Sequence, residues 1–172
     1  MASASTGTFD NGDTVRFVRA LPGPVERVWD HLTNSALLPV WFGSEGMAFS
    51  IGAGEGQPVS LMGGHVTGAV VEWQPPTRLA YTWNLNQPGM PPAPESVVRI
   101  ELRSRGDAVE LDLRQAPVPG PIAPFSLAGW HSFLDRLGAM LRGEAPGDVM
   151  QAMQDNQAVY QRLVAGGASH GS

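Results

Sequence analysis

One segment in the second half of the chain alternates polar and apolar residues on both sides of a tight turn, and it constrains the fold more than any other feature. The turn is at residues 105–107. The apolar positions are every second residue on either side of it: Val98, Ile100, Leu102, Val109, Leu111 and Leu113. Because successive side chains of a strand point to opposite faces, this pattern predicts a β-hairpin with one apolar and one charged face. The apolar face has to be covered by another layer of structure.

The same period of two predicts further strands before this hairpin. It recurs at 14–20, 65–73 and 78–84, and in a form interrupted by Gly and Ser at 47–61. Proline-rich segments at 87–94 and 117–124 are expected to be loops, because proline cannot donate a hydrogen bond to a neighbouring strand. The sequence therefore predicts an antiparallel sheet of about six strands.

Helical patterns occur before and after the predicted sheet. Residues 25–34 have apolar side chains at helical spacing after Pro24, and a short helical turn is expected at 35–38. A broad apolar stripe over 130–141 predicts a long helix that ends at Gly143. Asp148 and Gln151 resemble a capping box that opens a last helix over 148–165. Met140, Met150 and Met153 are expected to serve helix packing. The resulting fold class is α+β.

Composition limits the functions open to the chain. Its 172 residues suit one domain, and a net charge of −5 argues against binding nucleic acid. There is no cysteine, so thiolate chemistry and zinc–sulfur sites are excluded. No signal peptide is recognisable, and no apolar run reaches the ~20 residues of a membrane span. We expect a cytoplasmic protein with disordered tails at 1–13 and 166–172, a domain over 14–143 and an additional helix over 144–165.

Several short segments, taken in order, resemble a known family. They are residues 21–29 (LPGPVERVW), 41–43 (WFG) and 68–83 (GAVVEWQPPTRLAYTW), followed by Gly129 and Trp130. Together they resemble the START-like (SRPBCC) superfamily, and more narrowly the bacterial proteins similar to the C-terminal domain of the activator of the Hsp90 ATPase. The resemblance covers about 14–143. It implies a helix-grip fold, in which a curved sheet wraps around a long C-terminal helix with a small helix pair after the first strand, and a hydrophobic cavity lies between sheet and helix.

The candidate site follows from the aromatic residues and the cavity that the resemblance implies. We predict that the protein binds or carries a small hydrophobic molecule, mainly by burial of apolar surface. Tyr81 could orient the ligand through its hydroxyl, and His131 could reach the mouth of the cavity. For each aromatic residue alone, ordinary core packing remains the alternative. The predicted ligand-binding residues are Trp41, Phe42, Tyr81, Trp83, Trp130, His131, Phe133 and Leu137.

Two other functions stay open at this stage, because relatives in the superfamily include carriers, polyketide cyclases or aromatases and co-chaperone domains. A cyclase-like enzyme would use Tyr81 and His131 as acid and base. A protein-interaction module, or a homodimer, would use the helix at 148–165. We expect no cofactor, and no metal, because the four histidines lack ligand spacing. The glycines at 52, 54 and 56 lack the helix and lysine of a phosphate loop.

Overall fold

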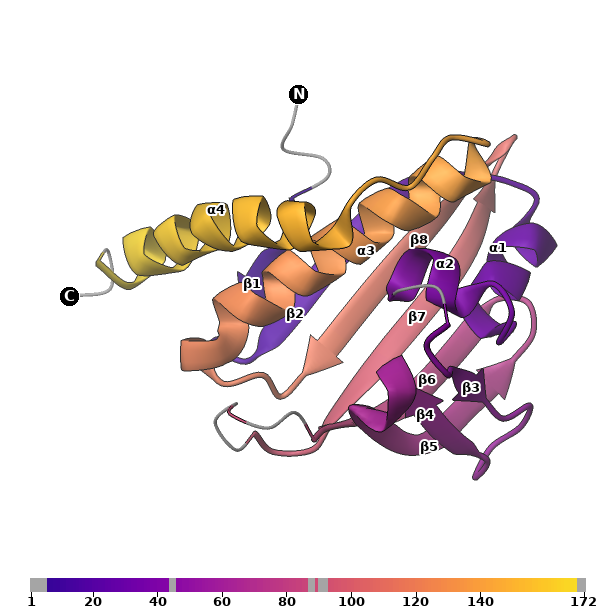
Figure 1. Ribbon diagram of the computed structural model, residues 1–172, viewed down its shortest axis with the longest axis horizontal. Helices are drawn as coiled ribbons and strands as arrows, with labels where there is room; N and C mark the ends of the chain where they lie inside the picture. Colours follow the sequence, from indigo (N-terminus) through magenta and orange to yellow (C-terminus); the bar gives the residue numbers. More distant parts are fainter. Residues whose placement is uncertain (1–5, 44–45, 87–88, 90–92, 170–172) are drawn as a thin grey trace.

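The computed structural model describes residues 6–43, 46–86, 89 and 93–169, and it has the predicted helix-grip architecture (Figure 1). An antiparallel sheet forms one layer, with eight strands in the order β1-β2-β8-β7-β6-β5-β4-β3. The prediction of about six strands omitted two short ones. The strands are β1 (Thr8–Asp10), β2 (Thr14–Pro22), β3 (Ser50–Ile51), β4 (Pro58–Leu61), β5 (Val66–Gln74), β6 (Arg78–Leu85), β7 (Ser96–Arg105) and β8 (Ala108–Ala116).

The hairpin of β7 and β8 has the predicted faces. Ile100 pairs with Leu113, and Leu102 with Leu111, and all four are buried. Gly106 sits in the connecting turn with φ of +64°, a conformation that costs glycine little. β2 pairs along the other edge of β8, so the first long strand and the last strand lie side by side.

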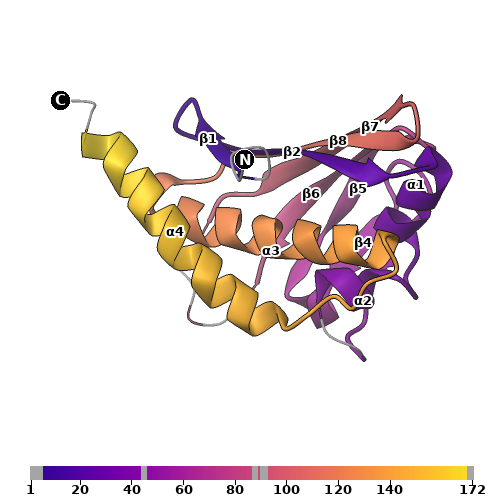
Figure 2. The same ribbon diagram turned by 90° about the horizontal axis from the view of Figure 1, so that it is seen from above.

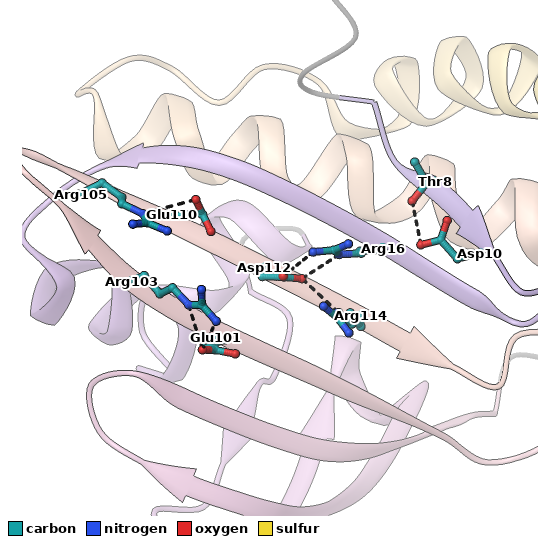
Figure 3. Close-up of polar contacts among 9 residues, drawn as sticks. All are labelled: Thr8, Asp10, Arg16, Glu101, Arg103, Arg105, Glu110, Asp112 and Arg114. Atoms are coloured by element: carbon teal, nitrogen blue, oxygen red, sulfur yellow. Dashed lines mark hydrogen bonds and ion pairs between the residues drawn. The ribbon is translucent and has the colours of Figure 1, made fainter.

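The outer face of the sheet carries ion pairs, as the alternation predicts (Figure 3). Arg16 and Arg114 both contact Asp112, at 2.8 and 3.4 Å. Partial burial opposes ionisation of Asp112, but hydrogen bonds from the two guanidinium groups outweigh it and lower its pKa. Glu101 is paired with Arg103 at 2.9 Å. These charges stay at the solvent side and leave the opposite face apolar.

A local irregularity bends the other half of the sheet. The register between β5 and β6 shifts between Val70 and Glu72, which is a β-bulge. At Gly68 the two strands approach so closely that an added Cβ would lie 2.0 Å from the carbonyl oxygen of Thr82. Because of the bulge, Val70 and Trp73 both pack in or against the core although they are three positions apart. A bulge increases local twist, which suits a sheet that curves around a helix (Figure 2).

In the part of the chain that the structure describes, four α-helices accompany the sheet: α1 (Val25–Thr33), α2 (Leu38–Phe42), α3 (Ala123–Leu141) and α4 (Val149–Ser169). α3 lies along the concave side of the sheet, and α4 crosses α3 obliquely (Figure 2). α2 begins later than predicted, and α3 begins earlier. Pro39 and Pro124 lie within the first turns of these helices, where a missing N–H is harmless. Asp148 caps α4 by accepting hydrogen bonds from the N–H groups of Met150 and Gln151.

Two segments that were predicted to belong to disordered tails have regular secondary structure. Residues 8–10, expected to belong to a disordered tail, form β1 and pair with residues 14–16. α4 continues to Ser169, beyond the predicted end at 165. Residues 1–5, 170–172 and most of the predicted loop at 87–94 lie outside the described residues. Of the helices described, none is both long and apolar enough to cross a membrane.

Candidate functional site

A pocket of about 400 Å³ opens between one end of the sheet, the first half of α3 and the start of α4. Most of its lining is apolar. Aromatic rings come from α2, β6 and α3, and methionines come from the segments around them. The aromatic and methionine residues of the lining are Phe42, Trp83, Phe125, Trp130, Phe133, Met47, Met62, Met150 and Met153. Its composition and size are those of a small-molecule site.

The aromatic residues form one connected cluster around Phe42. The ring centroid of Phe42 lies 5.2 Å from that of Trp130, 5.0 Å from that of Phe133 and 6.2 Å from that of Trp83. Trp83 and Trp130 are 5.4 Å apart. These separations are typical of favourable tilted and edge-to-face ring contacts. The cluster therefore gives the pocket a rigid aromatic wall.

A hydrogen-bonded group of polar side chains lies in the lining, centred on Gln115 at the end of β8. Gln115 Oε1 accepts from Trp130 Nε1–H at 2.8 Å and from the Ser126 hydroxyl at 3.2 Å. Gln115 Nε2 donates to Ser96 Oγ at 2.9 Å. The indole N–H can only donate, so this contact fixes which end of the amide faces α3. We call Gln115, Ser96, Ser126 and Trp130 the Gln115 cluster.

Four of the eight predicted site residues line the pocket: Phe42, Trp83, Trp130 and Phe133. Tyr81 does not. It projects from the same face of β6 as Trp83 but lies two residues earlier in the strand, where the core is closed. Burial raises the pKa of its hydroxyl, as expected for a phenol enclosed by apolar groups. The prediction identified the correct face of the strand and the wrong position along it.

Trp41 and Leu137 are also core residues that do not line the pocket. The Trp41 indole N–H donates to the carbonyl oxygen of His31 at 2.7 Å, so its polar end is already satisfied inside the core. Leu137 follows Trp130 on the same side of α3, but there the helix packs directly against β2. At the next residue, Gly138, an added Cβ would lie 3.7 Å from the Leu21 side chain, so this part of α3 is in van der Waals contact with β2.

His131 points away from the pocket toward β2 and α4. Its Nδ1 lies 2.7 Å from the hydroxyl oxygen of Tyr160, and its Nε2 lies 3.3 Å from Asp135. The edge of its ring faces Phe17, with centroids 6.1 Å apart. On α3, His131 follows Trp130 by one residue, which turns it about 100° around the helix. The predicted position at the cavity mouth was wrong for this reason.

Comparison with known proteins places this fold in a family. The sequence model described as "Activator of Hsp90 ATPase homolog 1-like protein" matches residues 22–142. The chain belongs to this family. No curated protein matches the sequence.

Three solved structures illustrate the relationship of this Hsp90-activator-like protein to others. CalU16 from Micromonospora echinospora is 25% identical, with a TM-score of 0.70 and 88% of each chain covered. DynU16, from the dynemicin biosynthetic locus, is 25% identical with a TM-score of 0.63, and the match covers 80% of this chain and 50% of that one. An HSP90 activator from Plasmodium falciparum, PFC0360w, shares the fold at 19% identity and a TM-score of 0.55, covering 63% of this chain and 76% of its own.

In this member of the Hsp90-activator-like family, Arg136 holds the helices that form the pocket rim. Its guanidinium donates to the carbonyl oxygens of Val40 at 2.7 Å and Trp41 at 3.2 Å, and also to that of Gly147 just before α4. Burial lowers its pKa. By tying the end of α2 and the start of α4 to α3, Arg136 positions Phe42 and the methionines of α4 around the pocket. No predicted feature identified this role.

The lining offers few groups for acid–base or metal chemistry. Among the residues described, no group of three or more His, Asp or Glu side chains could hold a metal ion. His65 lines the exposed side of the pocket. Met150 and Met153, predicted only to pack helices, are part of the lining, where their flexible thioethers suit an adaptable wall.

Proposed function

We propose that the protein binds a small, largely apolar molecule in the pocket between β6, α3 and α4. The observation that carries this proposal is the continuous aromatic and methionine lining of a volume of about 400 Å³. This volume lies within the range of pockets that bind small organic molecules. A ligand that buries roughly 200 Å² of apolar surface would gain roughly 5 kcal/mol at 25 cal/mol per Å², before the entropy cost of association.

The similar structures add modest support. DynU16 is a protein of the dynemicin biosynthetic locus, which is a setting of small-molecule chemistry. Its 25% identity to this chain supports a ligand of that general kind without naming one. Binding to a small molecule is also a common use of a helix-grip cavity in the superfamily, as the sequence resemblance implies.

The experiment is native mass spectrometry of protein purified from its own host, with a variant that fills the pocket. Gly129 faces the pocket, and an added Cβ there would meet Phe133 and Met153 at 3.8 and 3.9 Å, so the site tolerates a side chain. We expect a stoichiometric extra mass on the wild type that Gly129→Leu loses and Ala139→Leu, outside the lining, keeps. An equal extra mass on Gly129→Leu would place the ligand elsewhere, and a clean protein mass would argue against tight carriage.

The cyclase-like alternative loses the two residues on which it depended. Tyr81 is enclosed in the core, and His131 is hydrogen-bonded to Tyr160 on the other side of α3. Acid–base catalysis needs groups that converge on one bound substrate. Tyr81 and His131 do not converge on the pocket, and we do not propose this activity.

A second candidate function is self-association through α4. This helix packs against α3 of its own chain, but Val159 and Leu163 remain 43% and 53% exposed. An exposed apolar strip on a helix suits a partner surface. Light scattering of Leu163→Glu, with Gln161→Glu as the charge control, tests this. We expect only the first variant to lower the mass of any oligomer, and a monomeric wild type would overturn the idea.

A further inference from the structure

Two hydrogens of the Gln115 cluster have no acceptor among the residues that the structure describes. A glutamine amide carries two N–H hydrogens and a carbonyl oxygen with two lone pairs. Trp130 and Ser126 fill both lone pairs of Oε1, while Ser96 accepts only one of the Nε2 hydrogens. Within the described residues, neither the second Nε2 hydrogen nor the Ser96 hydroxyl hydrogen has an acceptor.

The two uncommitted hydrogens lie in the wall of the pocket. Gln115 and Ser96 are 5% and 3% exposed, yet both belong to the lining. They come from adjacent strands at the end of the sheet where the aromatic cluster begins. A buried N–H without an acceptor is costly, whereas an unused hydroxyl lone pair is tolerated more easily. The cluster therefore favours an incoming acceptor over an incoming donor.

We propose that the pocket selects an apolar, ring-containing ligand that carries a hydrogen-bond acceptor, with a ketone-type oxygen bound by Gln115 Nε2–H and the Ser96 hydroxyl. This inference rests on the proposed binding function and defines the class of ligand more narrowly. A purely apolar ligand of the same shape displaces water from both hydrogens and leaves them unpaired. An acceptor-bearing ligand replaces that water, so the same apolar contacts give tighter binding.

The test compares two probes that differ only in the acceptor. 9-Fluorenone and fluorene have the same fused-ring outline, and only fluorenone has a carbonyl oxygen. Binding of each to the wild-type protein is measured by quenching of tryptophan fluorescence, since Trp83 and Trp130 line the pocket. We expect fluorenone to bind about tenfold more tightly, which corresponds to about 1.4 kcal/mol.

The variant Gln115→Glu removes the donors while keeping an acceptor for Trp130. The carboxylate has no N–H, and the Ser96 hydroxyl can turn to donate to it, so both uncommitted hydrogens disappear. We expect the ratio of the fluorenone and fluorene affinities to fall to about one, with far-UV circular dichroism showing that the variant is folded. In Arg99→Ala, which removes an exposed side chain outside the lining, the preference should remain.

A second measurement needs only the wild-type protein. A hydrogen-bonded ketone has a lower C=O stretching frequency than a free one, so infrared spectra of bound fluorenone should show a shift to lower frequency relative to fluorenone in hexane. Equal wild-type affinities, an unshifted carbonyl band, or a preference that persists in Gln115→Glu would overturn the acceptor inference while leaving apolar binding intact. Failure of both probes to bind would overturn both proposals.

Discussion

The hydroxyl group of Tyr160 joins three parts of the chain. It accepts a hydrogen bond from the N–H of Gly7 at 2.8 Å and lies 2.7 Å from His131 Nδ1. His131 Nε2 faces Asp135, so a tautomer with the hydrogen on Nε2 lets the Tyr160 hydroxyl donate to Nδ1. Through this atom α4 is connected both to α3 and to the segment that leads into β1. Replacing the hydroxyl with hydrogen, Tyr160→Phe, tests whether the connection stabilises the fold.

The expected cost follows from the groups left behind. Each lost hydrogen bond is worth about 1 kcal/mol net, and a buried donor without a partner costs about 1–3 kcal/mol. Gly7 is buried and its N–H cannot regain water without movement, whereas His131 is partly exposed and can. We therefore expect Tyr160→Phe to lower the free energy of unfolding by about 2 kcal/mol. The measurement is urea denaturation followed by circular dichroism.

The other tyrosine of the chain provides a matched control. Tyr81 is equally enclosed, and within the described structure its hydroxyl makes no hydrogen bond. Tyr81→Phe removes a buried donor that has no partner, so it should leave the free energy of unfolding unchanged or raise it by about 1 kcal/mol. Hydrogen exchange adds a local test, because only Tyr160→Phe should speed exchange of the Gly7 amide. The reasoning is refuted if the two variants are equally stable, or if Gly7 exchanges at the wild-type rate in both.

Three further substitutions test other parts of the structure. Arg136→Met should lower the free energy of unfolding by about 3 kcal/mol in urea denaturation, because several buried carbonyl oxygens lose their donor, while exposed Arg142→Met should have little effect. Gly68→Ala should lower the thermal midpoint through a clash with the adjacent strand, whereas Gly120→Ala, with no atom within 4 Å of the added Cβ, should not. Burial alone would raise the pKa of Asp135, but hydrogen bonds from His131 and Arg19 outweigh burial, and the net pKa is lowered. The ionised carboxylate therefore stabilises the fold above about pH 4, and this stabilisation is lost as the pH falls through the lowered pKa. Asp135→Asn should therefore flatten the decline in the urea midpoint below pH 4, and an unchanged pH profile would contradict the pairing.

The parts of the fold that repeat every two residues could be predicted from the sequence, and the parts formed by irregular segments could not. The hairpin of β7 and β8 alternates strictly, and its predicted faces are confirmed. β1 and β3 are too short for a period to be recognised, and their pairing depends on neighbouring strands. α2 was also too short to be recognised from its sequence. Pro39 suggested that a helical turn ends before it, but it lies in the first turn of α2.

The pocket was harder to predict than the strands. Which residues line it depends on how far along each strand and helix the pocket lies. Periodicity shows which face of a strand or helix is apolar, but it does not show where a curved sheet separates from the helix that covers it. Tyr81 and Leu137 share faces with Trp83 and Trp130, and they fall where the layers are in contact. The pocket also takes residues from loops, such as Pro117 and Pro119, whose placement follows from no period.

Gln115 was not among the predicted site residues, although the sequence held a usable signal for it. It continues the series Val109, Leu111 and Leu113 at the same spacing of two, so strand geometry places its amide on the apolar face. An amide on that face must form hydrogen bonds, because burying an unpaired polar group destabilises the fold by more than burying an apolar side chain there would stabilise it. The partners it finds, Ser96 and Trp130, are also the ones that bring it into the pocket wall. Aromatic rings are stable in a core without any ligand, whereas a buried amide needs hydrogen-bond partners from the protein or from a ligand. A polar residue that interrupts an inward apolar series is therefore a stronger indication of a binding site than another aromatic residue.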